Sequence, residues 1–399
     1  PLFSLESRKP LKDFDIVGFS LGYELTYTNM LNILHLGGIP VFSRERSKAP
    51  IVIAGGPCSF NPSPLSEFVD IFFIGDAEES LPEFLHLYRK LKSKSLSRDE
   101  ILKASSNLKG LYVPLIHKEN CNVKKRSVPS LEESFYPTRP IVPFIKTIHD
   151  RVAIEIMRGC PNTCRFCQAR SLYSPLRLRS RDKITELAIR ALKNTGYEEI
   201  SFLSLSSSNH PDLIAVLDDI NKAFSGKGIN ISVPSLRIED LCADLPSRIA
   251  KSRKTGLTFA PEAGSERLRQ VLGKKIEVDK LLEAARGAFK HGWRRIKLYF
   301  MIGLPGETHT DLDGIADLVR EVCLLKRDID GRKADVTLSI NNFIPKPHTP
   351  FQRLGINEEG KLKEKQAYLK SIVKERSIKL DFQNTKLSIL ESALSRGDY

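Results

Sequence analysis

The stretch of sequence that decides the fold is MRGCPNTCRFC, residues 157–167. It places Cys160, Cys164 and Cys167 in the spacing C-x3-C-x2-C, directly after an apolar strand. Three thiolates on one short loop match three corners of a cubane iron cluster, and the fourth iron stays open for a small-molecule ligand. A structural zinc site usually takes four ligands from two paired units, and this sequence has no second pair. The spacing therefore predicts a four-iron, four-sulfur (4Fe-4S) cluster held by these three cysteines.

Strands alternate with helices from residue 152 onward, which is the pattern of a βα barrel. A closed eight-unit barrel needs about 250 residues, and six units fall short of that. The sequence therefore predicts a partial (β/α)6 barrel over residues 151–380, followed by a C-terminal extension at 381–399. The strands are expected at residues 152–157, 199–205, 229–234, 256–260, 295–302 and 334–344, and the helices at 182–194, 212–224, 278–291, 310–325 and 358–376.

Residues 1–92 alternate in the same way and predict a separate α/β domain. Apolar runs at 15–21, 51–54 and 69–74 are expected to form a doubly wound parallel sheet, whose ligand site lies beyond the carboxyl ends of the strands. Residues 93–150 lack this rhythm, so we expect a linker with extended segments. The sequence begins as though in the middle of a domain, so we expect this domain to be incomplete. We also expect the C-terminal extension to be truncated.

Composition narrows the class of protein. With 41% hydrophobic and 28% charged residues, the 399-residue chain has the profile of a soluble globular protein. No apolar stretch approaches the roughly 18 residues needed to cross a bilayer, so no membrane partner is expected. Seven cysteines scattered through a large chain are unlike a secreted disulfide framework. They favour a reducing compartment, which is the cytoplasm by default.

The charge is strongly positive, at +14 overall, and the stretch 158–181 holds six arginines without an Asp or Glu. A positive field at the cysteine loop suits RNA phosphates or another anionic substrate. It also balances the negative charge of a thiolate-bound cluster, and both interpretations stay open. Lysine-rich solvated helices are a further source of the total charge. RNA is thus one candidate substrate.

The motif C-x3-C-x-aromatic-C after the first strand of a βα barrel resembles that of the radical S-adenosylmethionine (SAM) superfamily. The resemblance implies that the amine and carboxylate of SAM chelate the open iron. It also implies that one electron cleaves the sulfonium and yields a 5′-deoxyadenosyl radical. The cofactor supplies this chemistry, while the protein supplies orientation and dryness. A reductant such as a flavodoxin or ferredoxin is implied as a partner.

Segments at the ends of the later strands resemble SAM-binding elements of the family, in the family's order. Active sites of βα barrels lie at these carboxyl ends. The resemblance assigns a serine-rich loop to the amine, a glutamate to the ribose or amine, an arginine to the carboxylate, and an aromatic residue and a glycine turn to the adenine. Each also has an ordinary alternative, such as loop packing, a helix-start carboxylate or a surface salt bridge. The serines are Ser204 and Ser206, the glutamate is Glu262, and the arginine is Arg237. The aromatic residue is Phe166, and the glycine turn contains Gly303 and Gly306.

The segments DIVGFS (15–20), IVIAGGPCSFNP (51–62) and VDIFFIGDAEES (69–80) resemble part of a cobalamin-binding domain. The resemblance implies that Gly55, Gly56 and Gly75 lie against the corrinoid, where side chains would clash. Many such domains supply a lower axial histidine in an Asp-x-His-x-x-Gly motif. Here the only His-x-x-Gly is at His35, and Ile33 takes the Asp position, so we expect His35 to be a packed helix residue. Cobalamin therefore stays an open cofactor.

The whole arrangement resembles an uncharacterised family of radical SAM proteins with an amino-terminal cobalamin-binding-like domain. The expected function is methyl or related group transfer to an unidentified substrate, with RNA and protein as candidates. PKPHTPF, residues 345–351, is similar to an element of tRNA methylthiotransferase-like and cobalamin-dependent members, and His348 is either a substrate contact, a proton donor or a turn residue. The alternatives are rearrangement or sulfur insertion without cobalamin, and a non-catalytic cobalamin or redox sensor.

Overall fold

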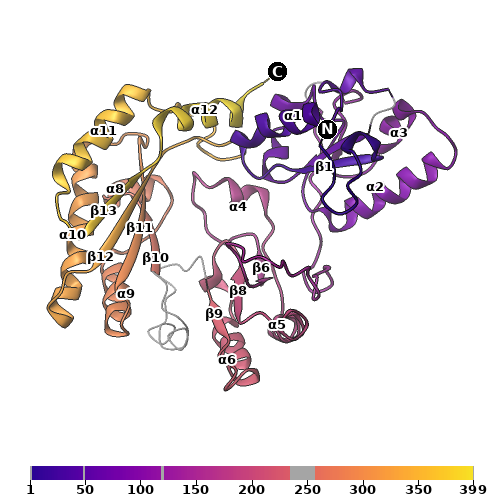
Figure 1. The fold of residues 1–399 in the computed structure, drawn as a ribbon. Helices are drawn as coiled ribbons and strands as arrows, with labels where there is room; N and C mark the ends of the chain where they lie inside the picture. Colours follow the sequence, from indigo (N-terminus) through magenta and orange to yellow (C-terminus); the bar gives the residue numbers. More distant parts are fainter. Residues whose placement is uncertain (1, 48–49, 118–120, 234–256, 399) are drawn as a thin grey trace. The chain divides into compact units, whose positions relative to one another are not determined.

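The computed structural model describes residues 2–47, 50–117, 121–233 and 257–398, and it forms two compact units (Figure 1). One unit comprises Pro1–Pro129 together with Leu390–Tyr399, and the other comprises Ser130–Ile389. This division differs from the expected boundaries at 92, 150 and 380. Within the described ranges, no helix is both long enough and apolar enough to cross a membrane.

The first unit is a doubly wound sheet, as its apolar runs predicted. Strands β1 (Ile16–Ser20), β2 (Ile51–Gly55) and β3 (Ile71–Phe73) are parallel and adjacent in that order. Helix α1 (Tyr27–Leu36) packs on one face of the sheet. Helix α2 (Ala77–Lys92) packs on the other face together with the helix that follows it. Both sheet faces are thus buried, which explains why the strands read as continuous apolar runs.

Two further elements of this unit fall inside the stretch that we expected to be a linker. Helix α3 (Arg98–Ser105) begins at Ser97, whose side chain accepts from the Glu100 N–H while the Glu100 carboxylate accepts from the Ser97 N–H. This capping box satisfies two otherwise unpaired backbone donors and starts a helix in a polar sequence. Strand β4 (Leu111–Tyr112) then pairs antiparallel with β3.

The second unit carries the partial barrel. Strands β5 (Val152–Glu155), β8 (Glu199–Leu203) and β9 (Asn230–Ser232) form one parallel sheet, covered by α5 (Arg181–Thr195) and α6 (Leu213–Ala223). A second parallel sheet has the order β10, β11, β12, β13, and α9, α10 and α11 lie along one side of it (Figure 1). These elements are β10 (Leu257–Glu262), β11 (Arg295–Ile302), β12 (Asp335–Asn342), β13 (Ile378–Phe382), α9 (Val278–Lys290), α10 (His309–Asp330) and α11 (Glu359–Ile372).

All six expected barrel strands are present, so the predicted fold class is confirmed, but β13 adds a seventh strand as the fourth member of the β10–β13 sheet. The sequence predicted a helix as far as residue 376, whereas α11 ends at Ile372 and β13 follows. Ile378, Leu380 and Phe382 alternate with Lys379 and Asp381, which is the period of a strand and not of a helix. β13 pairs in parallel with β12 and extends the sheet beyond the expected sixth unit.

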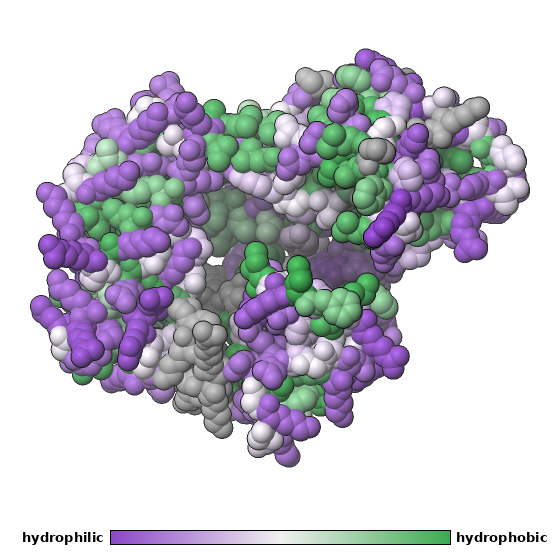
Figure 2. Space-filling model, viewed as in Figure 1, coloured by the Kyte–Doolittle hydropathy of each residue, from purple (hydrophilic) through white to green (hydrophobic). Residues whose placement is uncertain are grey.

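Short elements complete the chain. β6 and β7 form a small antiparallel pair around the cysteine loop. The solvent-facing sides of α10 and α11 are hydrophilic (Figure 2), and α11 holds four lysines against two glutamates, so it contributes to the positive charge. The remaining elements are β6 (Met157–Arg158), β7 (Arg177–Leu178), α4 (Gln168–Leu172), α8 (Glu266–Val271), α12 (Thr385–Arg396), and the 3-10 helices Leu11–Asp13, Glu24–Thr26, Ser43–Glu45, Pro57–Phe60, Ser63–Leu65 and Ser207–Asn209.

Candidate functional site

The cysteine loop leaves β6 at Gly159. This glycine has φ +91°, and a Cβ there would lie 2.8 Å from the Tyr173 carbonyl oxygen, so the backbone of residues 173–176 packs directly against it. The Cys167 N–H donates to the Cys164 carbonyl at 3.3 Å, which closes a turn between two of the predicted ligands. All three cysteines are half-buried.

The thiols share one electrostatic neighbourhood with a glutamate from a later strand. Burial raises the pKa of the Cys167 thiol above its ordinary value, and negative charge on Cys160 and on Glu262 adds to the rise. Backbone N–H groups of Arg170 and Ala169 oppose it. The end of β10 therefore lies beside the cysteine loop, as expected for residues at the carboxyl ends of barrel strands.

The donor set fits an iron–sulfur cluster better than a single metal ion. In the part of the chain that the structure describes, no three His, Cys, Asp or Glu side chains gather closely enough to hold one ion. A cubane places each thiolate on a different iron, so its sulfurs stand farther apart than the ligands of one ion. Three thiolates on one loop, half-buried and without a fourth protein ligand among the described residues, meet that requirement.

An asparagine that the sequence analysis missed links the loop to the serine segment. The Asn162 amide donates to Cys160 Sγ at 3.2 Å and to Asn209 Oδ1 at 3.0 Å. Ser206 Oγ donates to the same Asn209 oxygen at 2.7 Å. Ser204 Oγ lies 2.8 Å from the Ser207 hydroxyl. Of the two predicted amine-binding serines, Ser206 is therefore one hydrogen-bonded asparagine pair away from a predicted cluster ligand.

Glu262 ends β10 in an unusual backbone conformation. Its φ of +69° lies in the left-handed region, and the strand register shifts between Phe259 and Glu262. Such strain persists only where the surroundings hold it, and it is frequent at functional sites. The Glu262 carboxylate pairs with Lys274 Nζ at 2.9 Å, and both side chains are more than four-fifths buried. Lys274 was not predicted, because a lysine after a helix has no signal of its own.

Phe166 and the glycine turn meet in one apolar cluster. Phe166 packs against a buried group that includes Leu304 of the turn, with Leu268 and Phe343. Gly303 has φ +80° and Gly306 has φ +70°, so the turn uses conformations that favour glycine. An aromatic ring beside a glycine turn is the arrangement that we expected for an adenine pocket. The turn is anchored as well, because Arg267 donates to the Gly306 carbonyl at 2.9 Å.

A buried ion pair holds the other end of this turn. Glu307 Oε2 accepts from the Gly303 N–H at 2.8 Å and from Lys365 Nζ at 2.5 Å, and its side chain is 1% exposed. Burial raises the pKa of Glu307, and the Lys365 ammonium opposes that shift. The turn after β11 is therefore fixed to α11.

Most of the arginines that predicted a positive field at the cysteine loop are held by neighbouring groups, and two of them are paired with carboxylates. Five of the six arginines in residues 158–181 have partners within the second unit. Arg158 pairs with Glu155 at 2.8 Å, and Arg181 pairs with Asp219 at 2.6 Å. The others donate to backbone carbonyls, Arg165 to Val271, Arg177 to Tyr173 and Pro175, and Arg179 to Leu131 and Glu155.

Two of the three glycines of the first unit, Gly56 and Gly75, are explained by its own packing. Gly56 has φ +102°, and a Cβ would lie 2.8 Å from the Leu21 carbonyl oxygen. Gly75 has φ +113°, and a Cβ would lie 2.0 Å from the Arg126 carbonyl oxygen. A Cβ on Gly55 would make only an ordinary contact, 3.7 Å from Phe73. No corrinoid is needed to account for Gly56 and Gly75, and the contact of all three glycines with cobalamin stays a prediction.

Three other residues singled out in the sequence have different outcomes. His35 is exposed on α1, so the expectation that it is packed is wrong. His348 has φ +61°, and its N–H donates to Gln352 Oε1 at 3.0 Å, which stabilises the turn. Arg237 lies outside the described residues.

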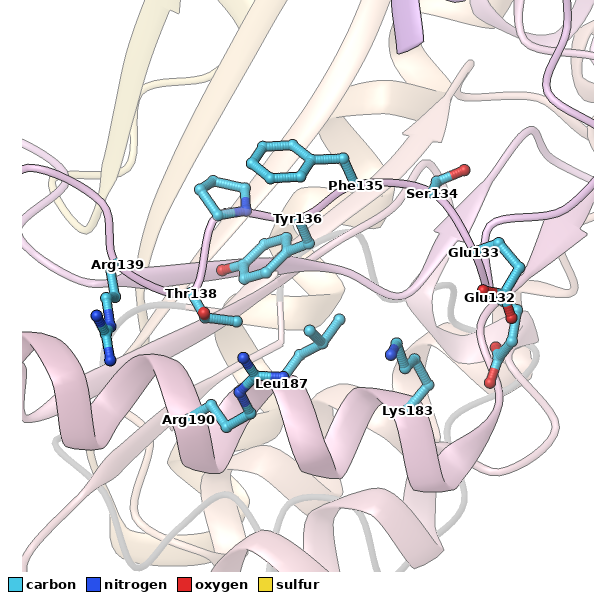
Figure 3. Close-up of a pocket in the computed structure, with 11 residues that line it drawn as sticks. Glu132, Glu133, Ser134, Phe135, Tyr136, Thr138, Arg139, Lys183, Leu187 and Arg190 are labelled. Atoms are coloured by element: carbon cyan, nitrogen blue, oxygen red, sulfur yellow. The ribbon is translucent and has the colours of Figure 1, made fainter. Parts of the chain in front are cut away.

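A cavity of about 560 Å³ in the second unit lies away from these candidates (Figure 3). It is formed by the segment 132–139 and the side of α5, and no predicted cofactor residue lines it. Its Lys183 and Arg190 both pair with Glu186. Its positive charge is therefore partly neutralised.

Comparison with known proteins places the chain in a family. Residues 154–319 match the model of the radical SAM superfamily, and residues 1–114 match that of the N-terminal domain of radical SAM proteins. Over its whole length the chain is 32% identical to the uncharacterised protein MJ0966 of Methanocaldococcus jannaschii, and it covers 81% of that protein. The chain belongs to the radical SAM superfamily. As a member, it is an enzyme that uses a 4Fe-4S cluster and SAM.

More distant relatives share parts of this arrangement. The ribosomal protein uS12 methylthiotransferase RimO of Thermotoga maritima is 26% identical over 184 residues, which are 42% of this chain and 41% of RimO. The radical SAM methyltransferase TsrM of Kitasatospora setae, solved with cobalamin and a 4Fe-4S cluster, has a similar fold with a TM-score of 0.58 and 13% identity. The match covers 84% of this chain and 63% of TsrM. The cobalamin-dependent enzyme OxsB gives a TM-score of 0.54 at 16% identity, over 88% of this chain and 53% of OxsB.

Proposed function

We propose that Cys160, Cys164 and Cys167 hold the cluster and that the enzyme transfers a methyl or related group to its substrate. The observation that supports this site most directly is the hydrogen-bonded run from Cys160 through Asn162 and Asn209 to Ser206. It joins two segments about 45 residues apart in sequence that were assigned independently to the cluster and to SAM.

The chemistry that the bound cluster supplies is one electron to the SAM sulfonium. The side chains of this chain bind and orient SAM. The Ser204 and Ser206 hydroxyls accept from the amine, and Glu262 accepts from the ribose or the amine once it is released from Lys274. The turn at Gly303 and Gly306, with Phe166, encloses the adenine and keeps water away from it. Arg237 remains our candidate for the SAM carboxylate.

The activities that appear in the names of two similar proteins favour group transfer. RimO is a methylthiotransferase that matches 42% of this chain, and TsrM is a methyltransferase whose fold is similar over 84% of it. We further propose cobalamin as a second cofactor, since the fold shared with TsrM and OxsB extends over most of the chain. A flavodoxin or ferredoxin is our candidate for the electron donor, and protein or RNA for the substrate.

The test is an anaerobic assay of the reconstituted enzyme with SAM and dithionite, with and without cobalamin. We expect 5′-deoxyadenosine in both conditions, and S-adenosylhomocysteine that depends on cobalamin. Absence of 5′-deoxyadenosine from a protein with verified iron and sulfide content would contradict the radical mechanism. Absence of corrinoid binding would leave rearrangement or sulfur insertion without cobalamin.

Glu262→Gln is expected to weaken SAM binding about 10- to 100-fold, because a hydrogen bond to a charged group contributes ~1.5–3 kcal/mol. Equilibrium dialysis with SAM on the reconstituted protein measures this. Glu283→Gln, at an exposed position of α9, is the matched control and should bind SAM like the wild type. Equal affinity in all three proteins would remove Glu262 from the site.

Glu307→Gln is expected to raise the SAM dissociation constant about tenfold, since the turn at Gly303 loses its charged acceptor and Lys365 loses its buried partner. The same dialysis measures it, with Glu364→Gln on the exposed side of α11 as control. An unchanged affinity would show that the turn does not depend on this ion pair.

A further inference from the structure

The β10–β13 sheet has one face that its helices do not cover. On β11 the residues Ile296, Leu298, Phe300 and Ile302 are at most 1% exposed and pack with α9, α10 and α11. Successive side chains on a strand point to opposite faces. Lys297 and Tyr299 therefore project from the face opposite the helices, which is the inner side of the partial barrel.

The strand register gathers further polar side chains on this inner face. Thr258 on β10 pairs with Lys297, Lys297 with Thr337 on β12, and Thr337 with Lys379 on β13. The next row is formed by Tyr299, Ser339 and Asp381. Adjacent strands lie about 4.8 Å apart, so the Lys297 and Lys379 Cα atoms stand roughly 10 Å apart with a threonine between them. The inner face is defined by Thr258, Lys297, Tyr299, Thr337, Ser339, Lys379 and Asp381.

Such a face does not serve to fill the barrel. The interior of a closed βα barrel is packed with layers of branched apolar side chains. Here the corresponding positions hold hydroxyls, ammonium groups and a carboxylate, and Lys379 and Asp381 are exposed. Polar groups that converge on a concave surface are what fixes a polar ligand. Ser339 is buried by the chain itself, but Thr258, Lys379 and Asp381 are exposed, so the inner face offers polar groups to another molecule.

Its charge favours an anion. Across the described portion of the chain, neither Lys297 nor Lys379 forms an ion pair with a carboxylate. Lys297 Nζ instead lies 4.5 Å from the centre of the Tyr299 ring, which orders the ammonium without neutralising it. The inner face carries two ammonium groups, on Lys297 and Lys379, and one carboxylate, on Asp381. Its net charge is therefore positive.

We propose that the inner face recognises the substrate, and that Lys297 and Lys379 bind an anionic group of it, a phosphate or a carboxylate. This rests on the proposed function, because it treats the barrel as the place where the substrate is held. Lys297 precedes the end of β11 by five residues, or about 16 Å along the strand. The anionic group therefore lies remote from the reacting atoms, and its binding sets specificity and position.

The test is a calorimetric titration of the full chain, reconstituted with its cluster and without SAM, at low ionic strength. Inorganic phosphate, pyrophosphate and succinate are added in separate experiments. We expect saturable binding of at least one anion, and a dissociation constant at least about tenfold higher in Lys297→Ala and in Lys379→Ala. Binding of the phosphates alone identifies a phosphate-bearing substrate, and binding of succinate alone a carboxylate.

Lys290→Ala, an exposed lysine at the end of α9, is the matched control for total charge and should bind like the wild type. Lys297→Arg keeps the positive charge and should restore most of the affinity. Three results overturn the proposal: no anion binds to the wild type, both alanine variants bind as the wild type does, or Lys290→Ala weakens binding equally. The titration needs no SAM, so a failed 5′-deoxyadenosine assay contradicts the proposed function and leaves this result to stand separately.

Discussion

Alanine at Cys160, Cys164 or Cys167 is expected to reduce 5′-deoxyadenosine formation to the level of the buffer without enzyme. Each thiolate binds a different iron of the cubane, so no neighbouring side chain replaces a lost one. Among the described residues, no group of His, Cys, Asp or Glu side chains gathers closely enough to provide a substitute metal site. Iron and sulfide content, the spectrum of the reduced cluster and the 5′-deoxyadenosine yield are measured on each variant.

Cys121→Ala is the control, because Cys121 is exposed and lies in the other unit. It should keep the iron content and activity of the wild type. If any one of the three loop variants retained a full cluster and full activity, the ligand set would have to be sought elsewhere in the chain.

Asp70→Ala is expected to lower the free energy of unfolding by ~3–5 kcal/mol. This is the effect of removing one partner of a buried ion pair while the other charge stays buried. The Asp70 carboxylate accepts from Arg46 and Arg98 at 2.8 Å each, from the Val52 N–H at 2.7 Å, and from the Ser43 hydroxyl. The Arg46 and Asp70 side chains are both fully buried. Burial lowers the pKa of Arg46, and Asp70 opposes that shift, so removal of the carboxylate leaves an uncompensated charge in the core.

Urea unfolding followed by circular dichroism measures this effect as a lower midpoint for the first unit. Glu67→Ala is the matched control, because Glu67 pairs with Arg44 at 3.7 Å and both side chains are more than half exposed. Exposed pairs contribute about 0–1 kcal/mol, so this variant should unfold close to the wild type. Equal midpoints for the two variants would show that the buried pair does not stabilise the fold.

Local patterns predicted most of the fold and the core of the candidate site. The spacing of the three cysteines and the apolar runs of the six strands are properties of short segments, and they led to the family and to the partial barrel. Two of the elements that were missed, α3 and β13, also had local signals. Ser97 and Glu100 have the spacing of a capping box, and Ile378 to Phe382 alternate with the period of a strand.

The features of the site that the sequence could not predict depend on contacts between residues that are distant in the chain. The pairing of Asn162 with Asn209 joins loops from two strands, and the pairing of Glu262 with Lys274 depends on a backbone conformation that side-chain types do not reveal. The arginines of the cysteine loop looked free because their acceptors are mostly backbone carbonyls. Carbonyls carry no sequence signal, so the sequence could not show which arginines the backbone holds.

The return of the last ten residues to the first unit makes that unit discontinuous in sequence. Asn61 Nδ2 donates to the carbonyls of Ser395 and Gly397 at 3.1 and 3.2 Å, and the Tyr23 hydroxyl donates to Glu391 at 2.5 Å. The polypeptide therefore crosses between the units twice. A single proteolytic cut at either crossing would leave the units covalently joined through the other. A fragment that stops at residue 129 would lack the segment that these hydrogen bonds hold.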